Sequence, residues 1–244
     1  MEKKPSQGAL ETEVKLRDEF FSTVAHELRN PLNALHLTLA GLMRAQSGSN
    51  PLPADQVIAR INRASNQVTR LSKLVDDMLD VSRISSGRFN LQNEEFDASA
   101  VLSDVVERMK DQAEPVQIAV SVPASLVMRS DRVRFAQVAS NLLSNAIQYG
   151  NQNPIEIRLG SDDENVRLEV VDHGIGIATQ DQERIFERFE KLGKDTPNVR
   201  FGLGLWISRE VVSAMRGTIA VSSQLGEGST FVVELPKATA AIPS

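Results

Sequence analysis

The sequence predicts an α+β protein of more than one domain, in which an N-terminal helical hairpin precedes a two-layer domain of mixed strands and helices. Apolar residues recur at helical spacing over residues 9–86. Beyond Gly87 the period changes to short alternating runs separated by turn residues. A length of 244 residues also suits two domains better than one. We expect the hairpin to occupy 1–87, the second domain 88–236 and a short tail 237–244.

The first helix has an apolar seam with the alternating steps of four and three residues that are typical of coiled coils. Pro31 is expected to interrupt and kink it, because proline lacks an amide hydrogen and its ring clashes with the preceding turn. The seam then resumes until turn residues gather over Ser47–Asp55. Its members are Leu10, Val14, Phe21, Val24 and Leu28 before the proline, and Leu32, Leu35, Leu39 and Leu42 after it.

The second helix repeats this pattern and is expected to end at Gly87. Two helices alone leave one apolar face exposed on each. Pairing two hairpins into a four-helix bundle covers those faces, so we expect a homodimer. The seam consists of Val57, Ile61, Ala64, Val68, Leu71, Val75 and Met78, widened by Leu74, Leu79 and Ile84.

In the second domain, alternation and turn chemistry predict strands and capped helices. Asp97 and Asp131 stand where their side chains can cap helices, and the second of these helices is expected to run through Tyr149. A further helix is expected from about Leu203 to Met215. Strand character lies at 89–96, 117–120, 126–128, 155–159, 166–172, 218–223 and 230–235, with 155–159 and 166–172 paired across a turn.

Composition excludes several classes of protein. The net charge of −5 and the scattered basic residues disfavour a nucleic-acid partner. Without cysteine there are no disulfides, thiolate metal sites or thiol nucleophiles, and the three separated histidines do not suggest zinc. No apolar run approaches the ~20 residues of a membrane span, and the polar start has no signal-peptide core. We expect a cytoplasmic chain, tied to a membrane only through an anchor upstream of Met1.

The segment Phe20–Leu35 contains the first candidate site. His26 should point partly outward from its helix, next to Glu27 and one turn from Asn30. A carboxylate can hold one ring nitrogen of a histidine and keep the other unprotonated, which suits a nucleophile. A surface histidine on an amphipathic helix would look the same.

Two asparagines mark the second candidate site. Asn141 and Asn145 are four residues apart and share one face of their helix. Two amide oxygens there could contact one hard cation or its waters. A capped or surface pair is the alternative.

Glycine-containing segments supply the remaining candidates. In VVDHGIGI, Asp172 could accept a hydrogen bond from an exocyclic amine, while Gly174 and Gly176 let the backbone approach a planar ligand. In RFGLGLW, Gly202 and Gly204 lead into a helix whose first amides could bind phosphate. A strand-to-loop turn and a plain helix-entry loop would explain these glycines as well. The segment GEGSTF alone would be a hairpin turn.

In this order, the segments resemble the sensor histidine kinases of two-component systems. The resemblance covers roughly Phe20–Leu235. It rests on a phosphoacceptor segment His26–Pro31, the asparagine pair, a first glycine segment Asp172–Gly176, a phenylalanine segment Ile185–Phe189, a second glycine segment Gly202–Leu205 and the terminal Gly226–Phe231.

The resemblance implies that the hairpin serves dimerisation and phosphotransfer and that the second domain is a two-layer α/β sandwich of the Bergerat ATP-binding type. It implies ATP-dependent autophosphorylation of His26, followed by transfer of the phosphoryl group to an aspartate in the receiver domain of a response regulator. Glu27 would act as base or orienting partner, and Asn30 would position water for phosphatase activity toward that regulator. A sensory domain is expected upstream, outside this chain.

The cofactors implied by the resemblance are ATP and Mg²⁺. Asn141 and Asn145 would help hold the metal and the phosphates, and Asp172 would bind the adenine amine. Further nucleotide contacts are expected from Gln148, Tyr149, Gly174, Gly176, Ile177, Phe186, Arg188, Phe189, Lys191, Gly202, Leu203, Gly204, Leu205 and Thr230.

Gln148 departs from the family pattern, because many relatives carry lysine there. A glutamine offers the phosphates only a neutral donor. Either a nearby cation, for which Arg188 and Lys191 are the candidates, supplies the missing positive charge, or ATP binds more weakly. His36 and His173 are not expected to carry phosphate.

Two other functions stay open on the sequence alone. One is an ATPase or chaperone of the same nucleotide-binding superfamily, and the hairpin with His26 argues against it. The other is a degenerate kinase that acts as a dimeric ATP-binding scaffold or phosphatase. The complete asparagine and glycine segments argue against that reading.

Overall fold

The structure is a computed structural model that describes residues 7–47, 52–113, 115–188, 190 and 202–238. It divides into two compact units, Met1–Leu79 and Asp80–Ser244. The first unit is helical, and the second combines strands with helices. The α+β organisation expected from the sequence is confirmed.

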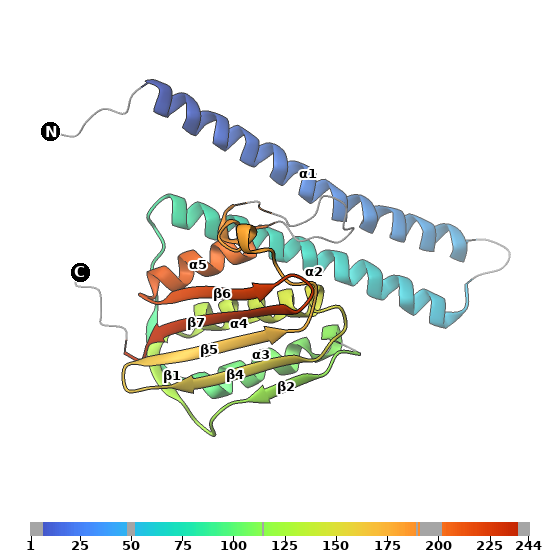
Figure 1. The fold of residues 1–244 in the computed structure, drawn as a ribbon. Helices are drawn as coiled ribbons and strands as arrows, with labels where there is room; N and C mark the ends of the chain where they lie inside the picture. Colours follow the sequence, from blue (N-terminus) through green and yellow to red (C-terminus); the bar gives the residue numbers. More distant parts are fainter. Residues whose placement is uncertain (1–6, 48–51, 114, 189, 191–201, 239–244) are drawn as a thin grey trace. The chain divides into compact units, whose positions relative to one another are not determined.

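The helical unit is built from α1 (Gln7–Gln46) and most of α2 (Ala54–Ser85), the two arms of the predicted hairpin (Figure 1). α1 continues through Pro31 without a break, so the interruption expected there is not observed. A proline removes one amide hydrogen bond, and the hydrogen bonds on either side can keep the helix continuous. Of the predicted loop, residues 48–51 lie outside the described residues.

Both helices of the hairpin expose large apolar side chains. On α2, the side chains of Ile61, Val68 and Val75 are each about half exposed, at 50%, 50% and 47%. Their spacing of seven residues places them on one stripe. Among the side chains that the structure describes, the other exposed large apolar residues of the two helices are Leu32, Leu37, Leu39, Met43, Ile58 and Leu79. Within the described residues, no helix combines the length and apolar character needed to cross a bilayer.

The end of α2 belongs to the second unit and closes with a recognisable capping pattern. The Arg88 amide donates to the Arg83 carbonyl at 2.9 Å, and the Gly87 amide donates to the Ile84 carbonyl at 3.1 Å. This pair of hydrogen bonds is the Schellman motif, which commonly has glycine at this position. The prediction that Gly87 ends the helix is confirmed.

The second unit contains a five-stranded sheet in the order β2-β4-β5-β7-β6. β2 runs parallel to β4, and the other neighbours are antiparallel. A separate antiparallel pair joins β1 to β3. The strands are β1 (Asn93–Asp97), β2 (Ile118–Ser121), β3 (Val127–Asp131), β4 (Ile155–Ser161), β5 (Asn165–Asp172), β6 (Thr218–Gln224) and β7 (Gly228–Pro236), so the predicted strands are confirmed.

Helices α3 (Ala98–Ala113), α4 (Arg132–Tyr149) and α5 (Gly204–Ala214) cover one face of the large sheet (Figure 1). The predicted caps of α3 and α4 are confirmed. The Asp97 carboxylate accepts from the amides of Leu126 and Ser99, and these bonds, that of Leu126 most of all, hold its pKa below the ordinary value. The Asp131 carboxylate accepts from the Arg134 amide at 3.0 Å.

The core lies between this sheet face and the three helices. Alternate residues of β4 and β5 point inward, and Ile157 and Val170, which face each other in the register, are each 1% exposed. From the helices, the fully buried side chains include Leu102, Phe135, Leu142, Leu143 and Ile207.

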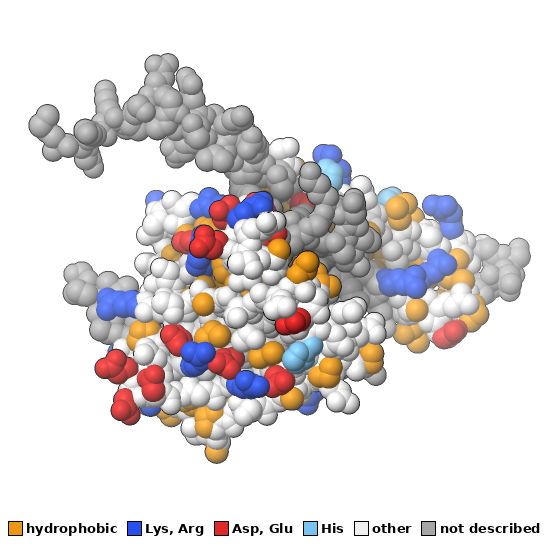
Figure 2. Space-filling view, in the orientation of Figure 1, with side chains coloured by type: hydrophobic (Ala, Val, Ile, Leu, Met, Phe, Trp, Pro, Cys, Tyr) orange, Lys and Arg blue, Asp and Glu red, His pale blue; other side chains and the backbone are white. Residues whose placement is uncertain are grey.

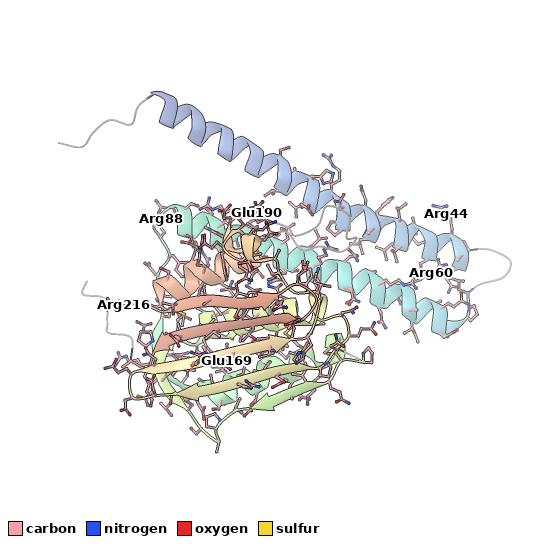
Figure 3. All side chains as sticks on the ribbon, in the orientation of Figure 1. Arg44, Arg60, Arg88, Glu169, Glu190 and Arg216 are labelled. Atoms are coloured by element: carbon pink, nitrogen blue, oxygen red, sulfur yellow. The ribbon has the colours of Figure 1, made fainter. Side chains whose placement is uncertain are left out.

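The opposite face of the sheet is open and carries a ladder of ion pairs. Figure 2 shows acidic and basic side chains side by side on it, and Figure 3 labels Glu169 of β5 within this ladder. Arg167 bridges Glu169 and Glu234, and Arg158 bridges Glu156 and Glu169. The ladder explains why the outward positions of these strands are charged while the inward positions are apolar.

Two short 3₁₀ turns, η1 (Thr179–Asp181) and η2 (Arg184–Phe186), follow β5 and lead towards α5. Ile185 and Phe186 of η2 are buried. The Phe186 ring meets the Phe231 ring of β7 edge-on, with centroids 6.4 Å apart. This contact anchors the predicted phenylalanine segment to the sheet.

Candidate functional site

Asn141 joins the middle of α4 to the start of α5. Its side chain is only 2% exposed, and its amide nitrogen donates to the Gly204 carbonyl at 3.3 Å and to Ser208 Oγ at 3.4 Å. The Ser208 hydroxyl in turn donates to the same carbonyl at 2.8 Å. Residues 63 positions apart in the sequence therefore meet in one polar cluster.

The first turn of α5 is suited to an anion. Leu203 stands in the N-cap position, and its side chain cannot accept a hydrogen bond from the helix. The first amides of a helix have no partner within the helix and carry the positive end of its dipole. Leu203 itself is buried, whereas Gly202, Gly204 and Leu205 are partly exposed. An anion bound there would lie on the same cluster as Asn141.

Asn145 follows Asn141 by one turn of α4 and is partly exposed. Gln148 and Tyr149 occupy the last turn of the helix and are also partly exposed. Residues four and then three positions apart lie along one face of an α-helix. The side chains of Asn141, Asn145 and Gln148 therefore line one stripe that leads from the buried cluster to the surface.

Asp172 is the last residue of β5 and is 5% exposed. The Gly174 amide donates to its Oδ1 at 3.0 Å. Burial raises the pKa of this carboxyl, while backbone hydrogen bonds from Gly174 and Ser229 and the nearby His173 act in the opposite direction. The result is a buried acceptor held in a fixed orientation.

The glycines after Asp172 allow three backbone segments to pack closely. A Cβ on Gly174 would lie 1.9 Å from the Tyr149 carbonyl oxygen at the end of α4. Gly176 has a φ of 65°, and a Cβ there would lie 1.9 Å from the Gln224 carbonyl oxygen. Larger residues would force the loop away from both α4 and the β6–β7 turn. The loop also contains buried Ile177, whose amide donates to Ser223 Oγ at 2.8 Å.

His26 lies on α1 in the helical unit and is exposed. The Asn30 amide nitrogen is 3.5 Å from His26 Nδ1, one turn along the helix. An asparagine amide can present either its NH₂ or its oxygen to a ring nitrogen, because the two ends are nearly the same shape. With the oxygen towards Nδ1–H, the lone pair of the imidazole lies on Nε2 and faces away from the contact.

Two family models match the chain. Residues 16–87 match the His Kinase A phosphoacceptor domain. Residues 130–239 match the ATPase family of histidine kinases, DNA gyrase B and HSP90. This chain belongs to the sensor histidine kinase family. Its two domains are those of a protein-histidine kinase.

Individual relatives agree with the family models. The kinase core is 31% identical over 238 residues to the sensor histidine kinase YclK of Bacillus subtilis, covering 96% of this chain and 49% of the relative. It is 31% identical to SenX3 of Mycobacterium tuberculosis over 227 residues, covering 90% and 54%. The chain thus spans about half the length of these two relatives, and 19% of a longer one, the sensor protein EvgS of Escherichia coli.

Solved structures resemble the kinase core in fold. The histidine kinase AdeS of Acinetobacter baumannii superposes with a TM-score of 0.65 at 29% identity, covering 87% of this chain and 98% of AdeS. Full-length ShkA in complex with AMPPNP gives a TM-score of 0.64 at 30% identity, covering 93% of this chain and 47% of ShkA. The fold class expected from the sequence is confirmed.

The contacts of the other predicted site residues are as follows. The Arg188 guanidinium stacks 4.2 Å from the centroid of the Trp206 ring and donates to Ser85 Oγ at 3.2 Å. Thr230 lies on β7 opposite Val171 of β5, one position from Asp172. Phe189 and Lys191 lie outside the described residues.

Ser208 and Ser229 are members of the site that the sequence analysis did not single out. Ser208 stands one helical turn after Gly204, a spacing that allows its hydroxyl to bond the Gly204 carbonyl. Ser229 is paired with Asp172 across the β5–β7 register and contributes a backbone hydrogen bond to its carboxyl. The serine spacing after the second glycine segment could have indicated the first, but only the strand register reveals the second.

Proposed function

We propose that this chain catalyses ATP-dependent phosphorylation of His26. The observation that carries the proposal is the Asn141–Gly204–Ser208 cluster, which places the polar stripe of α4 beside the first turn of α5. Unpaired amides at a helix start and adjacent side-chain amides form a suitable site for a polyphosphate. The ATPase family match and the AMPPNP complex of ShkA support ATP as the nucleotide.

Asp172 is proposed to select adenine. Its carboxylate is buried at the end of β5, and an exocyclic amine would supply the donor that a buried acceptor needs. Guanine presents a carbonyl at the corresponding position of its ring, which would face the carboxylate with an acceptor. The proposed lining of the base site includes Ile177, Gly174, Gly176, Phe186, Thr230 and Tyr149.

The residues fit a magnesium ion that is held mainly by the nucleotide. Among the described residues there is no cluster of three or more acidic or histidine side chains that could bind a metal by itself. Asn141 and Asn145 can provide amide oxygens, which are hard ligands of the kind Mg²⁺ prefers. When bound, the ion would neutralise phosphate charge, and the triphosphate and water would complete its coordination.

His26 is the proposed nucleophile. With Asn30 at Nδ1, the Nε2 lone pair attacks the γ-phosphorus, and an N–P bond forms as the bond from that phosphorus to the β–γ bridging oxygen breaks. ADP leaves with the electrons of the broken bond, and the phosphorylated ring, which is positively charged while Nδ1–H is present, becomes neutral when Nδ1 gives up its proton. Glu27 is proposed to assist as base or orienting partner.

The test is incubation of the full chain with γ-labelled ATP and Mg²⁺. We expect a label on the wild type that is stable in base and labile in acid, as a phosphorus–nitrogen bond is. His26→Gln should lose it. His36→Gln is the matched control, because His36 is also exposed on α1 but should not carry phosphate, and this variant should keep the label.

The outcomes separate the candidate functions. An unlabelled wild type that still binds ATP would favour a scaffold, and one that releases inorganic phosphate without labelling would favour an ATPase. Label retained in His26→Gln would move the phosphorylated site elsewhere.

We further propose that phosphorylated His26 passes its phosphoryl group to an aspartate of a response regulator receiver domain in the cytoplasm, and that Asn30 orients water when the same surface acts as a phosphatase. The exposure of both side chains supports access by a partner. We also propose that the half-exposed stripe of Ile61, Val68 and Val75 is covered by a second copy in a homodimer.

A further inference from the structure

Asp80, near the end of α2, is tied to the start of α4 by a buried polar network. Arg134 Nη1 donates to both carboxylate oxygens of Asp80 at 2.8 Å and to Gln137 Oε1 at 2.7 Å. Gln137 Nε2 donates to Asp80 Oδ2 at 2.7 Å, which closes a ring of three side chains. The side chains of Asp80 and Arg134 are 6% and 15% exposed.

The segment between α2 and β1 reinforces the same junction. The Arg134 guanidinium lies 4.6 Å from the centroid of the Phe89 ring. The Gln92 amide donates at 2.8 Å to the carboxylate of Asp131, the residue that caps α4. The first turn of α4 is therefore held by its cap, by the connecting segment and by Asp80.

The network shares a helix face with the proposed phosphate-binding side chains. Gln137, Asn141 and Asn145 are spaced by four residues, and Arg134 precedes Gln137 by three, so all four lie along one face of α4. The distance along the helix from Arg134 to Asn141 is roughly 10 Å, at 1.5 Å per residue. A shift or rotation of α4 at the Asp80 end would carry the asparagines with it.

We propose that Asp80 is a positioning residue for phosphoryl transfer: by holding Arg134 and Gln137, it fixes α4, and with it Asn141 and Asn145, against the end of α2. The proposal rests on the kinase activity proposed above. Asp80 lies in the last part of α2, which belongs to the same compact unit as α4, so the network acts within that unit.

A buried ion pair is not required for stability here, because well-packed apolar side chains of similar size often stabilise a core as well or better. An ion pair that also shares a side-chain amide fixes the relative orientation of the two helices that carry it, because its hydrogen bonds form in one orientation only. A second contact has the same consequence on another side of α2: Arg188, stacked on Trp206, donates to Ser85.

The test compares Asp80→Asn, Arg134→Gln and the double variant in the full chain. Two quantities are measured: the dissociation constant of ATP by displacement of a fluorescent nucleotide, and the initial rate of His26 labelling at saturating ATP. We expect each single variant to lose at least about tenfold in rate while the dissociation constant changes by less than about threefold. The double variant should be no slower than the slower single variant, because both remove one contact.

Two further variants test whether the effect depends on the position of the lost carboxylate and on the positive charge of residue 134. Asp76→Asn makes the same chemical change on an exposed side chain of α2 one turn earlier, and it should leave rate and affinity unchanged. Arg134→Lys keeps a cation opposite Asp80 and should retain more of the rate than Arg134→Gln. A lysine variant no faster than the glutamine variant would contradict positioning by this ion pair.

The other outcomes are equally decisive. A normal labelling rate in Asp80→Asn, with a lowered thermal midpoint, would make the network merely structural and overturn the proposal. So would a loss of ATP affinity as large as the loss of rate, or losses that multiply in the double variant. An unlabelled wild type would refute the proposed kinase function itself, and the positioning role would fall with it, whereas a labelled wild type with normal variants would refute the positioning role alone.

Discussion

The two units of the chain differ in how far their apolar side chains are exposed. In the second unit, Val170 of β5 lies between Ile157 and Phe231 of the neighbouring strands and is 1% exposed. In the first, Val68 of α2 stands on a stripe that is half exposed. The ATP-binding unit thus completes its own core, whereas the hairpin presents apolar surface that another surface must cover.

The candidate chemical groups follow the same division. Asn141 and Asp172 are buried and fixed by hydrogen bonds, while His26 is exposed and its ring contacts the Asn30 side chain. A nucleotide site benefits from fixed groups, because phosphoryl transfer depends on positioning and charge neutralisation. The proposed transfer of a phosphoryl group to His26, and from it to a partner, requires that its side chain remain accessible.

The largest expected effect contrasts the two valines directly. Val170→Lys would bury an unpaired charge in the sheet core, which is the kind of change that costs more than about 4 kcal/mol and can unfold a domain. Val68→Lys should cost the ATP-binding unit nothing, but it should separate the proposed homodimer by placing charges in its interface. Nucleotide binding measures the first effect, and sedimentation at micromolar concentration measures the second.

Asn66→Lys is the control for Val68→Lys, because it adds the same charge at an exposed position on a different face of α2. It should remain dimeric. A Val68→Lys variant that sediments like the wild type would refute the assignment of this stripe to the dimer, as would a monomeric wild type. If Val170→Lys still bound the nucleotide normally, the contrast between the buried core of the second unit and the exposed apolar stripe of the hairpin would be refuted.

The next effect concerns Asp172. Replacing its carboxylate with an amide should weaken ATP binding by roughly tenfold to a hundredfold, since a hydrogen bond to a charged group is worth about 1.5–3 kcal/mol. The same change should stabilise the unliganded protein relative to the wild type, and this gain should grow as pH rises. Titration with ATP and urea unfolding at a series of pH values measure the two effects.

The sign follows from the raised pKa of Asp172. Its ordinary value is 3.8, and burial raises the value in the folded state. As pH rises above 3.8, the carboxyl ionises more readily in the unfolded chain, so its contribution to stability is lost as pH passes through the folded pKa. Asp172→Asn cannot ionise, so its free energy of unfolding should rise relative to the wild type over this window and then level off.

Asp162 supplies a control of opposite sign. Backbone amides of Asn165 and Glu164 lower its pKa below 3.8, so its stabilising contribution is present above 3.8 and is lost as pH falls through the lower folded value. Asp162→Asn should therefore lose stability relative to the wild type as pH rises towards 3.8, and the difference should stay constant above that window. A flat profile for Asp172→Asn would contradict the raised pKa of the buried Asp172 carboxyl.

Much of this architecture could be predicted because its determinants are local. Helical apolar spacing predicts α2, and Asp97 and Asp131 cap helices through amides within three residues as well as through more distant ones. The site segments were likewise recognisable as continuous stretches. The break expected at Pro31 is the exception, because the local effect of a proline, one missing hydrogen bond, does not determine whether the helix on both sides persists.

The long-range pairings could not be predicted from the sequence. Asp80 and Arg134 are 54 residues apart, and the sequence around either residue does not indicate its partner. The pairing of β1 with β3 and the parallel pairing of β2 with β4 also depend on how helices pack between them. The contact of Arg188 with Trp206 is also long-range, and the expected contact of Arg188 with the phosphates stays a prediction.

The smallest expected effect concerns Gln148, which shares the face of α4 with Asn141 and Asn145 and is partly exposed. Gln148→Lys would add a cation beside the proposed phosphates, and a charge-assisted hydrogen bond is about twice as strong as a neutral one. We expect ATP to bind roughly threefold to tenfold more tightly, with little change for AMP, which lacks the outer phosphates. Gln180→Lys, which adds the same charge at an exposed position of η1, should leave both affinities unchanged. Equal gains in affinity for ATP and AMP would mean that residue 148 does not face the outer phosphates. If neither affinity increased, the supposed deficit of positive charge at this position would not exist.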